Sequence, residues 1–147
     1  MKLALSIGCL MTFATSVVAA TPGERQAARA LYDLTASSAR ALENAPFDRP
    51  ASQKLKAALE QKVEAFSFDM DGNDKDALFN CEYAAKQLVV ILADAILAQR
   101  PAAPARAKLM QERATDWATE MQGCRRFLKA PAVKVDMQAL TRRIAGN

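Results

Sequence analysis

Apolar residues in this chain recur at alternating spacings of four and three, the pattern of a helix with one buried face. The two clearest rows flank Gln99–Ala105, a segment with two prolines. Because proline cannot continue a helix, we expect the chain to reverse there, so that the rows face each other. The rows are Cys81, Ala85, Leu88, Leu92 and Ala95 before the turn, and Met110, Ala114, Trp117, Met121 and Cys124 after it.

This register predicts a disulfide between Cys81 and Cys124. Cys81 lies about as far before the turn as Cys124 lies after it, so antiparallel pairing brings them together at the open end of the hairpin. The chain-entropy model gives about 4 kcal/mol of stabilisation for a loop of this size. Two free, buried cysteines are the alternative.

The same spacing predicts three further helices, over about 21–44, 48–66 and 136–144. In the hairpin, the first helix should begin at a cap on Asp74, and the second helix should end near Lys129. Since no stretch is predicted to form a strand, we expect an all-α fold. It would be a four-helix bundle-like array with a disulfide-stapled αα-hairpin and a short C-terminal helix.

Local signals mark the helix ends. Thr21 and Glu24 form a capping box around Pro22, and Asp48 or Ser52 could cap the second helix. Within the third helix, three polar residues lie two helical turns apart, namely Asn80, Gln87 and Asp94. We expect this strip to reach solvent; a buried polar network is the alternative.

Residues 1–20 are typical of a secretory signal peptide, with Lys2, an apolar run and small residues up to Ala20. Cleavage there would leave one domain, 21–147, in a periplasmic or secreted compartment. Lipidation at Cys9 and a membrane anchor are the alternatives. After cleavage two cysteines remain, as in an exported protein with one disulfide, and no membrane span is expected.

The chain contains no histidine, which removes the usual general base and the commonest metal ligand. The expected architecture resembles c′-type and b562-type cytochromes, but the ordinary haem ligand is missing. Two carboxylate pairs, Glu60 with Glu64 and Asp116 with Glu120, are interpreted as solvated helix faces. We therefore expect no cofactor, no catalytic residue and no enzymatic activity.

The segment from Glu60 to Glu82 is acidic, whereas the C-terminal part is basic, and the net charge is +4. The hairpin should bring the acidic loop to the same end as Arg125 and Arg126. Both charges suit the helix dipoles; the functional alternative is a charged docking face. Its residues would be Asp69, Asp71, Asp74, Asp76, Arg125 and Arg126. The sixth position of a calcium-binding EF-hand loop is glycine, but here it is Asp74 or Asp76, counted from Asp69 or Asp71, so a weak ion site is only an alternative.

These features predict a small exported protein that binds a protein partner in the periplasm, and not nucleic acid. Size, export and helical content resemble the immunity proteins of secreted amidase toxins, without a shared motif. A periplasmic stress chaperone of helical-hairpin type is one alternative. Such chaperones carry Leu-Thr-x-x-Gln motifs, and here Leu34-Thr35 and Leu140-Thr141 lack the glutamine. A weak metal-ion-binding helical protein is the other alternative. The residues leave the oligomeric state open.

Overall fold

The computed structural model describes residues 18–44, 46–97 and 102–146, which form five helices and no strand. The all-α prediction is confirmed. The helices are α1 (Pro22–Asn44), α2 (Arg49–Glu64), α3 (Lys75–Leu97), α4 (Pro104–Leu128) and α5 (Met137–Ala145). Most of the predicted signal peptide, including Cys9, lies outside the described residues, as do positions 98–101 of the predicted turn.

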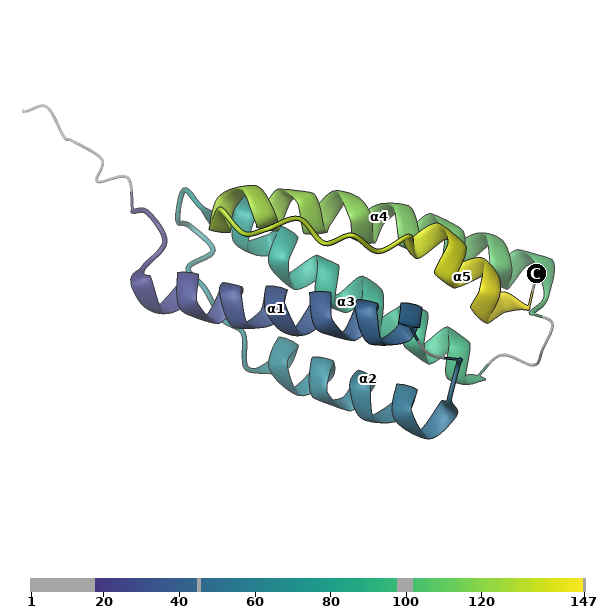
Figure 1. The fold of residues 1–147 in the computed structure, drawn as a ribbon. Helices are drawn as coiled ribbons and strands as arrows, with labels where there is room; N and C mark the ends of the chain where they lie inside the picture. The colour runs from purple at the N-terminus through teal and green to yellow at the C-terminus, as the bar shows by residue number, and fades with distance from the viewer. Residues whose placement is uncertain (1–17, 45, 98–101, 147) are drawn as a thin grey trace, which may run out of the picture.

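Helix α3 lies at the centre of the array (Figure 1). It packs against α4 and α2, and α1 lies across all three. Within the described residues α2 and α4 do not meet, so the first four helices form a flattened rhombus with α1 and α3 on its short diagonal. The central place of α3 follows from its composition, since Leu88, Ile91 and Leu92 lie on more than one side of the helix axis and are all fully buried.

The hairpin of α3 and α4 forms as the apolar rows predict. All ten residues of the two rows are buried, and Cys81 and Cys124 are joined by a disulfide with their Cα atoms 4.8 Å apart. Gly123 makes this close approach possible. A Cβ placed on Gly123 would lie 2.7 Å from Cγ and 3.2 Å from Cβ of Asn80 on α3. Any other residue at position 123 would displace the Asn80 side chain beside the disulfide.

After α4 the chain reverses and runs extended along α4 before α5 begins (Figure 1). Lys129 ends α4 in a left-handed conformation, with φ of 50°. Two glutamines then join α5 to α4: Gln111 donates to Thr141 Oγ1 at 2.6 Å, and Gln138 donates to the Gln111 carbonyl at 3.0 Å. Arg143 donates to carbonyls at the end of α1. These bonds hold α5 against both α4 and α1.

Three local expectations are decided by the structure. Asp48 caps α2 by accepting from the amide of Ala51 at 2.8 Å, whereas Ser52 is buried. The capping box forms, with Glu24 Oε2 accepting from the Thr21 amide at 2.7 Å. Asp74 occupies the cap position of α3, where its carbonyl accepts from the Leu78 amide at 2.9 Å. Its carboxylate accepts from the Ala20 amide and from Arg25, which reach it from the α1 side.

The polar strip on α3 does not behave as a simple solvated face. Asn80, Gln87 and Asp94 are all half-buried, because the strip faces α4. Arg113 of α4 lies between two of them: it donates to Gln87 Oε1 at 3.3 Å and forms an ion pair with Asp94 at 3.9 Å. The alternative of a polar network is therefore the better description of this strip, although solvent still reaches it in part.

Candidate functional site

The acidic loop is held to α1 by hydrogen bonds to charged side chains. Glu24 Oε1 accepts from the Asp69 amide at 2.7 Å, while its other oxygen accepts from Thr21. These bonds lower the pKa of Glu24 below its ordinary value of 4.5, with the Thr21 amide as the largest cause and the Asp69 amide next. The same carboxylate thus caps α1 and orients the loop.

A second link joins the loop, α1 and α4. Asp74 Oδ2 accepts from Arg25 at 2.9 Å, and the Arg25 guanidinium lies 4.5 Å from the centre of the Phe127 ring. Arg25 thus lies between a carboxylate and an aromatic face, an arrangement that suits its planar cation. The expected meeting of loop and α4 at one end occurs through Arg25 and Phe127, two residues outside the predicted docking face.

The six residues of the predicted docking face fall into three environments. Asp69 and Asp74 serve the loop itself, since Asp69 Oδ1 accepts from the Asp71 amide and Asp74 pairs with Arg25. Asp71, Asp76 and Arg126 are exposed, and no ion pair engages them within the described residues. Arg125 is half-buried and lines a cavity. No ion pair among the described residues joins Arg125 or Arg126 to the four acids.

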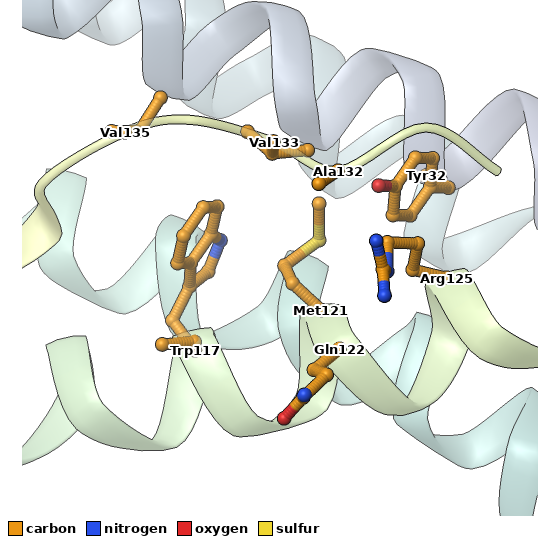
Figure 2. Close-up of a pocket in the computed structure, with 9 residues that line it drawn as sticks. Tyr32, Trp117, Met121, Gln122, Arg125, Ala132, Val133 and Val135 are labelled. Carbon is orange, nitrogen blue, oxygen red and sulfur yellow. The ribbon is translucent and has the colours of Figure 1, made fainter.

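This cavity has a volume of about 280 Å³ and opens between α4, α1 and the extended segment 130–136 (Figure 2). Trp117, Met121 and Arg125 line it from successive turns of α4, because residues four apart share a helix face. Val133 and Val135 line it from the extended segment, where alternate side chains point the same way. The remaining lining residues are Tyr32, Ala118, Gln122 and Ala132.

The polar groups of the cavity are mostly donors. Trp117 is 3% exposed, and its Nε1 is buried with no hydrogen-bond partner. Arg125 has no ion pair within the described residues, and no acidic residue lines the cavity. The Tyr32 hydroxyl donates to the Pro131 carbonyl at 2.7 Å, which ties the extended segment to α1. Burial raises the pKa of Tyr32, while the charge of Arg125 opposes that shift.

Sequence patterns alone did not identify this cavity. Trp117 and Met121 belong to the buried hairpin row, so they were interpreted as core, and Arg125 was placed on the docking face. The extended segment was assigned no element. A signal was present in the alternation of Val133 and Val135 with Lys134 and Asp136, which is typical of an extended segment with one covered side.

A shallower groove of about 310 Å³ lies between α2 and α3. Val63, Val89 and Val90 form its apolar floor, while Glu60, Glu64 and Lys86 stand at its edge. Beyond the groove, Tyr83 and Leu97 of α3 are also exposed, Leu97 to 73%. This side of α3 therefore presents apolar side chains to solvent.

Within the part of the chain that the structure describes, no three histidine, cysteine or acidic side chains gather closely enough to hold a metal ion. No helix in the described ranges is both long and apolar enough to cross a membrane. No protein-family model, curated protein or solved structure matches this chain, so no relative assigns a role to these residues.

Proposed function

We propose that this chain is an exported helical binding protein that docks onto a protein partner in the periplasm through its acidic loop, residues 69–76. One observation carries the proposal: Asp71 on the loop and Asp76 in the first turn of α3 are exposed and have no ion pair within the described residues, whereas Asp69 and Asp74 are engaged. Met70, which precedes Asp71 in the chain, is 55% exposed. An apolar side chain beside free acids suits a partner with a basic rim around an apolar contact.

The loop is pre-organised, which favours binding. The Gly72 amide donates to the Asp69 carbonyl at 3.3 Å, and the Lys75 amide donates to the Gly72 carbonyl at 3.2 Å. Together with the bond from the Asp69 amide to Glu24, these contacts hold the backbone in one conformation. A partner would then lose little free energy in ordering the loop. Free carboxylates on such a loop also accelerate association with a basic surface.

The compartment is part of the same proposal. The Cys81–Cys124 disulfide fits an oxidising environment, and residues 1–20 have the pattern of a cleavable export signal. In the mature protein, beginning at Thr21, the new terminal amine would lie beside Glu24, whose carboxylate already accepts from that nitrogen. The function we propose is binding, as in immunity or inhibitor proteins, and not catalysis.

Charge reversal tests the docking loop. Wild-type protein and the variant D71K/D76K would be used to capture partners from periplasmic extract, and any captured protein would be purified and measured by calorimetry. We expect the double reversal to weaken binding at least about 30-fold, since close charge pairs at interfaces are each coupled by more than 1 kcal/mol. Binding of the wild type should weaken as salt is raised.

The matched control is E112K/D116K, which makes the same change in net charge on exposed positions of α4. It should bind within about twofold of wild type. If no partner binds at micromolar concentration, or if both double variants lose binding equally, the proposed docking loop is wrong.

The groove between α2 and α3 favours a second candidate, a periplasmic chaperone. Its apolar floor of Val63, Val89 and Val90 could hold an apolar segment of an unfolded client, and Lys86 and Glu60 would remain solvated. The variant V90E would then lose the ability to suppress aggregation of a reduced client, while D71K/D76K would retain it. A wild-type protein without such activity removes this candidate.

A further inference from the structure

The cavity beside α4 goes beyond the proposed docking loop and uses different residues. We infer that it binds an apolar carboxylate with a second hydrogen-bond acceptor, the chemistry shared by N-acylated amino acids and polypeptide carboxyl termini. Three observations carry this inference: the unpaired cation of Arg125, the buried and unpartnered Nε1 of Trp117, and the apolar walls between them.

The lining selects the sign of the charge. Arg125 is the one charged residue in the lining, and no carboxylate of the described residues pairs with it. Arg40 and Arg29 also oppose the rise in the pKa of Tyr32, while Asp33, the ion-pair partner of Arg29, acts in the other direction. A half-buried guanidinium without a partner is a strong donor for a carboxylate, which it can hold in a bidentate geometry.

The spacing of the two donors selects an elongated ligand. Trp117 and Arg125 are eight residues apart, so their Cα atoms are separated by about 12 Å along the helix. Met121 lies between them, and the indole nitrogen lies on the edge of the ring that faces Met121 (Figure 2). Two acceptors on one elongated ligand suit this arrangement better than a single carboxylate. The carboxylate would bind Arg125, and a carbonyl farther along the ligand would accept from Trp117.

The walls accommodate the apolar part of such a ligand. Val133 and Ala132 face Met121 across the cavity (Figure 2), and a volume of about 280 Å³ suits a ligand the size of one acylated amino acid. Met121 is flexible and can move aside to uncover the indole N–H. A ligand carbonyl placed there would accept a hydrogen bond from the indole N–H. This bond would favour binding, because a buried donor without a partner destabilises the free protein.

The chain provides its own probe for this site, because Trp117 is the only tryptophan. Titration of the full mature protein with N-acetylphenylalanine should change the fluorescence of Trp117 and shift its single indole N–H resonance downfield. The amide of the same compound should bind at least about tenfold more weakly, since it lacks the charge that Arg125 recognises. Phenylpropionate, which lacks the second acceptor, should bind but leave the indole N–H unshifted.

Variants separate the roles of the two donors. R125Q should weaken N-acetylphenylalanine at least about tenfold, whereas R126Q, the matched loss of charge on the exposed neighbour, should change the affinity less than twofold. W117F keeps an aromatic wall and removes the N–H; by calorimetry it should weaken binding about fivefold, the effect of one neutral hydrogen bond. Circular dichroism of each variant checks that the helices remain.

A second titration, with a short peptide, distinguishes the two sources of the ligand. If Ac-Gly-Gly-Phe with a free carboxyl terminus binds more tightly than N-acetylphenylalanine, the natural ligand is a chain terminus; if it binds more weakly, the ligand is a free acylated amino acid. Either result supports the inference. It is overturned if neither compound binds at 10 mM, if amide and acid bind equally, or if R125Q and R126Q behave alike. D71K/D76K should leave binding of N-acetylphenylalanine unchanged. Failure of the cavity proposal can therefore be distinguished from failure of the docking-loop proposal.

Discussion

Helix α4 packs well against α3 and poorly against the extended segment that follows it. Toward α3, Met110, Ala114 and Cys124 are at most 1% exposed, and Gly123 lets the helices approach closely. Toward segment 130–136, the neighbouring face borders a cavity of about 280 Å³. Trp117 and Met121 belong to both faces: they fill the hairpin with one side and wall the cavity with the other.

The difference follows from backbone geometry. Two helices present side chains at matching intervals, so small and large residues can interdigitate along the whole interface. An extended segment presents a side chain to the same face about every 6.6 Å, whereas a helix places one on a face about every 5.4 Å. The two intervals do not match, and space remains between Val133, Val135 and the helix. A densely packed face and a binding cavity can therefore share one helix.

Removing the disulfide should have the largest effect. The double variant C81A/C124A should lose about 2–4 kcal/mol of unfolding free energy, because the denatured chain regains the freedom of a loop of 43 residues. Denaturant titration under oxidising conditions measures this loss, and wild type treated with reductant should show the same. Because the cavity does not depend on the bond, its volume and the environment of Trp117 should change little. A loss below about 0.5 kcal/mol would contradict this account.

The next effect concerns the close approach of the hairpin. G123A should cost about 1–2 kcal/mol, since the clash with Asn80 outweighs the better helix propensity of alanine. The double variant N80A/G123A should be less destabilised than the sum of the single variants, because alanine at position 80 gives part of the space back. Additive losses in the denaturant titrations would place the strain elsewhere.

On the cavity side, Y32F should cost about 1 kcal/mol by removing the bond to the Pro131 carbonyl. Faster hydrogen exchange in residues 130–136, with α3 and α4 unchanged, would localise the effect. The raised pKa of Tyr32 keeps the folded form protonated where the unfolded form ionises, so wild type should lose stability as the pH rises above 10. Y32F should lack that alkaline loss; an identical alkaline profile would contradict the role of burial.

The smallest effect is expected where α1 begins. The pKa of Glu24 is lowered on folding, so its contribution is present above the ordinary value of 4.5 and is lost as the pH falls through the lowered pKa. E24Q should show a shallower loss of stability on acidification than wild type. E64Q, a change at an exposed glutamate of α2, should follow the wild-type curve. If both variants follow the wild type, Glu24 does not hold the loop.

Much of the fold could be predicted from short-range patterns. The two hairpin rows, the partner of each cysteine and the caps at Glu24 and Asp48 all follow from periodicity and local hydrogen bonding. The docking face was less predictable, because charge sign does not reveal which acids are engaged. Asp74 pairs with Arg25, 49 residues earlier, and no local rule connects those two positions.

The helices, their buried faces and the disulfide can be predicted from the amino acids alone, since each depends on residues related by a fixed repeat or by symmetry about one turn. The extended return of the chain along α4 is visible only in the folded molecule. Among the residues that the structure describes, that return leaves Arg125 and the Trp117 N–H without partners beside an apolar cavity. The reason is physical: packing of an irregular segment depends on contacts such as Tyr32 with Pro131, 99 residues apart, which no periodic pattern encodes.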